Sequence, residues 1–236
     1  MAFSHTRHST HENGAPSSTT VAVTLASAVA SGSLVCVSVG WASNNGDTVT
    51  QIKDNNNVSF TLVDLGRDGV HGYSWQTAYL DSISGSPTTI TATISTSRTF
   101  ATIVVGEYIG GFGGASMSGH AMNIQTTIGS TSANAITSGN FTPAVNNCLI
   151  YGSVVDVPSN SAYTAGTNFT IRLNNLSGAF DTEDRTLATA ASTAATFTTS
   201  NVNSGGVTGG MGFKPFIAFP QEFMALRQAI VRASYW

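Results

Sequence analysis

Length, composition and charge narrow the class of protein before any motif is considered. The chain has 236 residues, 41% of them hydrophobic and only 9% charged, with a formal net charge of −3. That hydrophobic content supplies a core and excludes a disordered chain, while the few scattered lysines and arginines leave no basic stripe for nucleic acid.

The N-terminal residues 1–18 have the composition of a disordered tail. The run 21–41 that follows has no charge, yet it begins with alternating apolar residues and is interrupted by serine and glycine. Polar residues precede it, so it fits neither a secretory signal nor a membrane span. We expect the tail, including Phe3, to be held by a neighbouring subunit or by the chain's own fold.

Short apolar runs separated by turn residues fill the first half of the chain. The run 34–39, between glycines, is typical of a buried central strand. Six further segments have strand patterns and lack helical periodicity, which predicts a sandwich or barrel. These segments are 20–26, 49–53, 58–62, 73–79, 89–95 and 100–108.

The second half repeats this pattern after a glycine-rich connection at 110–119. Segment 147–156 resembles the central strand, and 168–171, 194–199 and 207–213 match 59–62, 89–95 and 104–108 in order. We predict two repeats, 19–109 and 120–215. They would form two separate barrels or one merged sandwich, and merging is favoured because separate halves would expose long sheet edges.

The last segment, 216–236, differs from the rest. Two prolines flank its first aromatic residues, and good helix formers follow from position 221, which predicts a short C-terminal helical arm. So many apolar side chains need cover, from the chain's own sandwich or from another subunit. The assembly contacts we expect here are Phe216, Phe219, Phe223, Leu226, Ile230, Tyr235 and Trp236.

The expected fold is therefore all-β: an antiparallel, jelly-roll-like β-sandwich (19–215) of two sequence-related halves, with an N-terminal extension (1–18) and a C-terminal arm. Cys36 and Cys148 lie in strand-like runs and read as buried free thiols. The tail histidines, three residues apart, could form only an adventitious metal site, so we expect no resident metal and no cofactor. They are His5, His8 and His11.

Acidic residues are the main candidates for chemistry. The cluster 181–184 with Arg185 lacks the spacing of a calcium loop, so we interpret it as structural or solvated. Glycoside hydrolysis would need two carboxylates to converge. The candidates are Asp64, Glu107, Glu183 and Asp184, and no nucleophile elbow, phosphate loop or zinc-protease motif accompanies them. His71 and His120, in glycine-rich stretches, are read as structural or solvent-facing.

Aromatic residues suggest a possible sugar platform. Tyr73, Trp75 and Tyr79 share one strand face, with Trp41 close by in the expected sheet. They could stack on glycan rings, but the opposite face carries Ser74, Gln76 and Ala78, which favours placing the aromatic residues in the core.

Several short motifs resemble a family of two-repeat β-sandwich proteins encoded by bacteriophages and bacteria. They are Gly-Ser-Leu-Val at 32–35, Val-Ser-Phe-Thr-Leu at 58–62, Tyr-Thr-Ala-Gly-Thr-Asn-Phe-Thr-Ile-Arg at 163–172, Glu-Asp-Arg at 183–185 and Gly-Phe-Lys-Pro at 212–215. The similarity spans 21–215 and implies a virion structural protein; no catalytic residues come with it.

We therefore expect a non-enzymatic capsid decoration or cement protein, made in the host cytoplasm and located in the virion. Its partners would be the major capsid protein or tail proteins, together with further copies of itself, and neither nucleic acid nor membrane. An uncharged polar surface packs against neighbours with little desolvation cost. The alternative is an extracellular carbohydrate-binding or adhesin module, and a glycan-cleaving enzyme is a third hypothesis.

Overall fold

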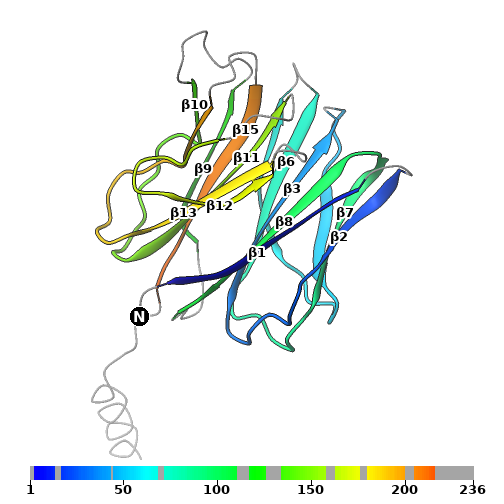
Figure 1. Cartoon of the computed structure of the whole chain (residues 1–236), viewed down its shortest axis with the longest axis horizontal. Coiled ribbons are helices and arrows are strands. Elements are labelled where there is room, and N and C mark those ends of the chain that lie inside the picture. Colours follow the sequence, from blue (N-terminus) through cyan, green and yellow to red (C-terminus); the bar gives the residue numbers. More distant parts are fainter. Residues whose placement is uncertain are drawn as a thin grey trace, which may run out of the picture.

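The computed structural model describes residues 3–13, 17–43, 45–68, 72–110, 117–125, 134–157, 163–175, 180–199 and 205–215. Every regular element in these ranges is a β-strand, and all the strand pairings are antiparallel (Figure 1). The predicted all-β sandwich is thus confirmed. The predicted helical arm at 216–236 lies outside the described residues.

The first half of the chain forms two sheets. Its strands are β1 (Ser4–Asn13), β2 (Ser18–Thr24), β3 (Leu34–Ala42), β4 (Val49–Asp54), β5 (Thr61–Asp68), β6 (Tyr73–Leu80), β7 (Thr89–Arg98) and β8 (Ala101–Ile109). The first large sheet has the order β1-β8-β3-β6-β5, and the first small sheet has the order β2-β7-β4.

The second half repeats this plan with seven strands. They are β9 (Met117–Gln125), β10 (Asn134–Thr137), β11 (Cys148–Val157), β12 (Thr170–Asn175), β13 (Phe180–Leu187), β14 (Thr196–Thr199) and β15 (Gly205–Phe213). The second large sheet has the order β12-β13-β11-β15-β9, and β10 and β14 form the second small sheet.

The two large sheets are duplicates in strand order and in register. Reading the second from β9 to β12 matches the first from β1 to β5. The registers also agree, since Leu34 pairs with Tyr108 on β8 and Leu149 pairs with Phe213 on β15. The structural repeats therefore begin at β1 and β9, earlier than the predicted starts at 19 and 120.

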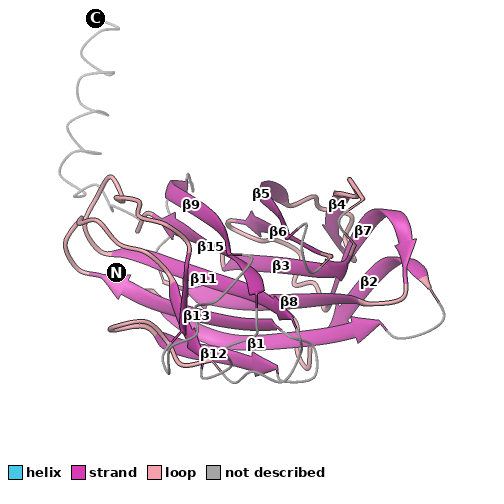
Figure 2. Cartoon of the chain, turned by 90° about the horizontal axis from the view of Figure 1, so that it is seen from above, coloured by secondary structure: helices cyan, strands magenta, loops and turns pink. Residues whose placement is uncertain are grey.

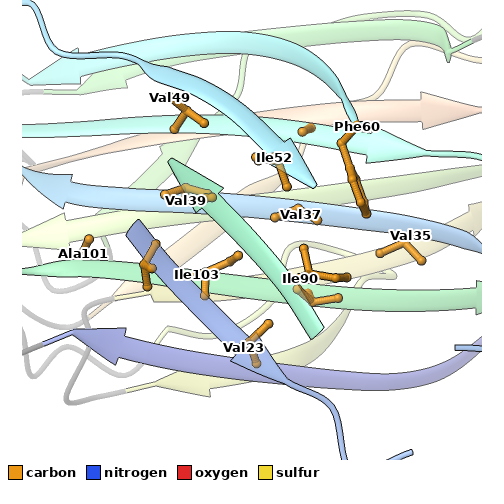
Figure 3. Close-up of a cluster of buried hydrophobic side chains, with 14 of the residues drawn as sticks. Val23, Val35, Val37, Val39, Val49, Ile52, Phe60, Ile90, Ala101 and Ile103 are labelled. Atoms are coloured by element: carbon orange, nitrogen blue, oxygen red, sulfur yellow. The ribbon is translucent and has the colours of Figure 1, made fainter. Parts of the chain in front are cut away.

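The strands form four layers, with the large sheets in the middle. Alternate side chains of β3 face opposite ways: Val35, Val37 and Val39 pack toward the first small sheet (Figure 3), whereas Leu34 and Cys36 pack against the second large sheet. Both faces of β3 are thus covered, which explains its continuous apolar composition. Each half has its own two-sheet sandwich, so the predicted merging into one two-sheet sandwich was wrong.

An approximate two-fold axis relates the two halves. β1 contacts β12, the counterpart of β5, while β5 contacts β9, the counterpart of β1 (Figure 2). Ser38 and Ser153 occupy equivalent positions at the centre, and their hydroxyl oxygens lie 3.0 Å apart. The interface between the halves is therefore built like that of a symmetric homodimer.

The N-terminal segment is part of the fold. Residues 4–13 pair with β8 along its whole length, from Ser4 opposite Ile109 to Asn13 opposite Ala101. Phe3 is only 8% exposed and packs between the two large sheets. Of the two explanations offered for the tail, docking on its own sandwich is correct, and the prediction that Phe3 contacts a neighbouring subunit was wrong.

Candidate functional site

The four aromatic residues considered for glycan stacking do not form an exposed platform. Trp41 and Trp75 are each 1% exposed. The Trp75 indole lies between the large sheets and donates a hydrogen bond to Ser153 Oγ at 3.1 Å. Tyr73 and Tyr79 are half-buried and pack against buried clusters. The prediction of glycan contacts is corrected for both tryptophans, and the alternative, a core role, is confirmed.

The acidic cluster 181–184 is a buried strand. It lies within β13, where Asp181, Glu183 and Asp184 are at most 4% exposed. The sequence did not indicate this strand because carboxylates are depleted in strands and rarely buried. Alternation along β13 directs Glu183 toward the second small sheet and Asp184 between the large sheets.

Glu183 ties β13 to the second small sheet. Its carboxylate accepts hydrogen bonds from the backbone N–H groups of Gly166 and Thr196, both at 2.8 Å. Burial raises the pKa of Glu183 to about 7, although the two N–H donors act in the opposite direction. Glu183 is thus a structural carboxylate that takes up a proton near neutral pH.

Glu107 has the corresponding role in the first half. It is fully buried, and its Oε1 accepts hydrogen bonds from Ala30 N–H at 2.8 Å and Ser33 Oγ at 2.9 Å. Its Oε2 forms an ion pair with Arg7 of β1 at 2.5 Å. Arg7 also donates to the carbonyl oxygens of Ser27 and Ala28, so this network holds β1 against the rest of the first half.

The candidate carboxylates point in three different directions. Glu107 faces the first small sheet, Glu183 the second small sheet, and Asp184 the space between the large sheets. The side chain of Asp64 lies outside the described part of the chain. The other three form no facing pair of the kind that glycoside hydrolysis requires.

One polar cluster does lie at the interface of the halves, and it is our candidate site. We call it the histidine cluster: His5, His8, Tyr108, Tyr151, Arg172 and Asp184, drawn from β1, β8, β11, β12 and β13. The two imidazoles stack with centroids 4.7 Å apart, and His5 Nε2 lies 2.6 Å from His8 Nδ1. Arg172 Nε donates to Asp184 Oδ2 at 2.8 Å.

Aromatic rings enclose His8. Tyr151 lies parallel to it with centroids 6.4 Å apart, and Tyr108 meets it edge-on at 6.0 Å. Both tyrosines are fully buried. The imidazole also covers Gly106, where a side chain would collide with it. His8 Nε2 has no hydrogen-bond partner among the described residues.

Burial and neighbouring charges keep the two histidines of β1 neutral. Desolvation, followed by the charges of His5 and Arg172, lowers the pKa of His8 to about 3. Desolvation and Arg172 also lower the pKa of His5, while Asp184 acts to raise it. Burial and the Asp184 charge raise the pKa of Tyr108. Near neutral pH the histidines are therefore uncharged.

The other end of the interface shows that the fold does not require the Arg172–Asp184 ion pair. The registers make Phe213 the counterpart of Tyr108, Tyr79 that of Asp184, and Val63 that of Arg172. Tyr79 meets Phe213 edge-on at 5.3 Å, and Val63 packs beside them. The buried tyrosine, the aspartate and the arginine of the histidine cluster are thus replaced by phenylalanine, tyrosine and valine at the other end, although His120 of β9 keeps the register position of His8.

Two histidines flagged in the sequence are placed by register. His11 lies an odd number of residues from His8, on the opposite face of β1, so the three tail histidines do not converge. His120 pairs with Met211 as His8 pairs with Gly106, which makes it the register counterpart of His8. In the described ranges, no three His, Cys, Asp or Glu side chains form a group that could hold a metal ion.

Cys36 and Cys148 are fully buried thiols that form no disulfide, as predicted. Cys36 lies in the cluster between the large sheets, and burial raises the pKa of its thiol well above the usual value. Both therefore behave as small core residues. Among the residues described, no helix is long and apolar enough to cross a membrane.

Comparison with known proteins does not assign this chain to a family. No family model matches the sequence, and no curated protein matches it. Among solved structures, the chain is similar to the C-terminal domain of the AgI/II polypeptide BspA of Streptococcus agalactiae. The two are 9% identical, the match covers 78% of this chain and 76% of that chain, and the TM-score is 0.20. A similarity this weak carries no argument.

Proposed function

We propose that this chain is a non-enzymatic structural protein of a virion, a capsid decoration protein that binds neighbouring proteins. The observation that carries the proposal is that its buried carboxylates bind groups within the fold. Glu107, Glu183 and Asp184 are each bound to backbone N–H groups, a hydroxyl or an arginine that joins one strand to another. The acidic groups most suited to chemistry thus serve as internal ties.

The low surface charge supports the same proposal. With only 9% of its residues charged, the chain presents hydroxyl and amide groups that desolvate at small cost against another protein. The partners we propose are the major capsid protein or tail proteins of the particle, together with further copies of the chain.

The proposed contacts now rest on the C-terminal segment alone, because Phe3 belongs to the core. Segment 216–236 lies two residues beyond the end of β15 and is rich in large apolar residues that need cover, seven of which are the proposed contacts. They are Phe216, Phe219, Phe223, Leu226, Ile230, Tyr235 and Trp236.

The first test is the state of the purified full chain in solution. We expect light scattering after size exclusion to show an oligomer, and a full-length variant with Phe223→Ser, Leu226→Ser and Ile230→Ser to be monomeric with an unchanged circular dichroism spectrum. A wild-type monomer, or a variant that remains oligomeric, would contradict the role given to this segment.

The second test uses particles that lack the protein. The wild-type chain should co-sediment with such shells, whereas the triple-serine variant should stay in the supernatant. If neither protein binds shells but the wild type binds a glycan array, the carbohydrate-binding alternative replaces this proposal.

A further inference from the structure

We propose that β1 is an acid-released strand: protonation of the His5–His8 pair expels β1 from the edge of the first large sheet and uncovers β8. This inference stands independently of the proposed function. It rests on the geometry of the histidine cluster, on the composition of β1 and on the place of β1 in the sheet.

Only one proton can lie between the two imidazole nitrogens that face each other. His5 Nε2 and His8 Nδ1 are 2.6 Å apart, so one nitrogen must donate and the other must accept. When both rings are protonated, two N–H groups point at each other across that distance. Because both residues belong to β1 and stack on each other, the repulsion cannot be relieved while β1 keeps its place.

The groups that face the pair do not compensate for added charge on His8. Tyr108 of β8, Tyr151 of β11 and Cys36 of β3 are neutral and fully buried. Arg172 of β12 carries a positive charge, and Asp184 of β13 is already paired with it. The desolvated imidazolium would therefore be more stable in water than in this site.

The rest of β1 depends on polar contacts. Between Ser4 and Asn13 the strand has no aliphatic or aromatic side chain apart from its histidines. The face opposite His8 is held by the ion pair of Arg7 with Glu107. By contrast, β2 contributes Val21 and Val23 to a hydrophobic core. Acid thus acts on the contacts that hold β1 and leaves those of β2 intact.

The position of β1 makes its release local. β1 is the first strand of its sheet and pairs only with β8 among the described strands (Figure 2). Its departure would leave the backbone groups of β8 from Ala101 to Ile109 unpaired along one side. An open edge of this kind can pair with another strand.

Hydrogen–deuterium exchange on the full chain tests the proposal. Exchange is followed by mass spectrometry between about pH 7 and about pH 4 and corrected for the intrinsic rate at each pH. Peptides from 4–13 and 101–109 should lose protection by up to tenfold per pH unit below about 6.5, the factor for one proton. Peptides from 205–213, in the counterpart strand β15, should stay protected.

Two variants separate His8 from other causes. His8→Phe keeps an aromatic ring against Tyr151 but cannot be protonated, so protection of 101–109 should lose most of its pH dependence, with only the part due to His5 remaining. His120→Gln, at the counterpart position, should behave as the wild type. A pH dependence in His8→Phe as steep as that of the wild type would show that a group other than His8 drives the release and would overturn the proposal.

A measurement on the wild type covers the case in which His8→Phe does not fold. The His8 imidazole resonances, followed by NMR, should change over the same pH range as the loss of protection in 101–109. The proposal fails if protection is the same at both ends of the range, if His8 titrates without loss of protection, or if 205–213 opens together with 101–109.

Discussion

At the scale of single residues, Gly209 shows that side chains of the two halves are complementary in size where they pack against each other. A side chain there would overlap the ring of Trp75. In the ladders, Gly209 pairs with Ser153 and Val104 pairs with Ser38, so Val104 is the counterpart of Gly209. Phe180, the counterpart of Trp75, packs in one cluster with Val104. The larger ring, Trp75, thus packs on a glycine, whereas the smaller ring, Phe180, packs with a valine.

This complementarity predicts coupled substitutions. Gly209→Ala should lower the free energy of unfolding by about 1–3 kcal/mol, because the added methyl group overpacks the interface. Trp75→Phe in the same chain should remove the collision and recover about 1 kcal/mol or more relative to additivity. Urea denaturation of the wild type, both single variants and the double variant measures this coupling; purely additive costs would contradict it.

Glu183 predicts a pH dependence of opposite sign to that of His8. Its folded pKa, about 7, lies above the ordinary value of 4.5, so its contribution to stability is complete below about pH 4.5 and is lost as the pH rises through about 7. Glu183→Gln cannot titrate. The stability of the variant relative to the wild type should therefore rise by about 1.4 kcal/mol per pH unit across that window.

Urea denaturation of both proteins at three pH values within the window is the measurement. Only the change with pH is diagnostic, because an amide cannot accept both the Gly166 and the Thr196 N–H groups as the carboxylate does. A stability difference that stays constant with pH would mean that Glu183 is ionised throughout.

At the scale of elements, β1 and β13 are among the strands that the sequence patterns did not predict. β1 is almost entirely polar, and β13 carries three buried carboxylates. Both belong to sheets because specific partners pair their charges: Arg7 with Glu107, and Arg172 with Asp184. No local pattern predicts such partners, since they are distant in sequence or on another strand.

The Arg7–Glu107 pair predicts how strongly β1 is held. Arg7→Met leaves the fully buried Glu107 without its cation and should lower the free energy of unfolding by about 3 kcal/mol. Adding Glu107→Gln removes the unpaired charge and should restore part of that loss. Thermal or urea denaturation compares the two; a double variant that is less stable than Arg7→Met would contradict this account.

At the scale of the whole molecule, the two halves share one interface around their approximate two-fold axis. Clusters that draw on both halves, with Ser38 and Ser153 at the centre, join the two large sheets. Burial of this extent couples their unfolding, so neither half is expected to melt alone.

Phe180 tests that coupling. It is 1% exposed between the large sheets, and Phe180→Ala should cost about 3–5 kcal/mol. Phe100→Ala is the matched control, since Phe100 is 56% exposed and should change stability by less than about 0.5 kcal/mol. Tryptophan fluorescence in a Trp236→Phe background reports only Trp41 and Trp75 of the first half, and it should change together with far-ultraviolet circular dichroism; separate transitions would show that the halves unfold independently.

Alternation and turn chemistry, which are local, were enough to predict the fold class, the central strands at 34–39 and 147–156, and the duplication. They also favoured core positions for Trp41 and Trp75, which are buried, although the opposite face of β6, with Ser74 and Gln76, is buried as well. The predicted segment 58–62 overlaps only the start of β5, which runs from Thr61 to Asp68. Strand ends are the part of an element that local sequence patterns predict least well.

Pairing between distant strands decided the rest. Three features depend on contacts between segments far apart in the chain. Phe3 lies inside the fold, each half forms its own sandwich, and the two histidines of β1 lie near Tyr151 and Asp184. Side-chain periodicity indicates which face of a strand is apolar but not which sheet covers it. Burial of that face stabilises the fold only when the correct distant strand packs against it.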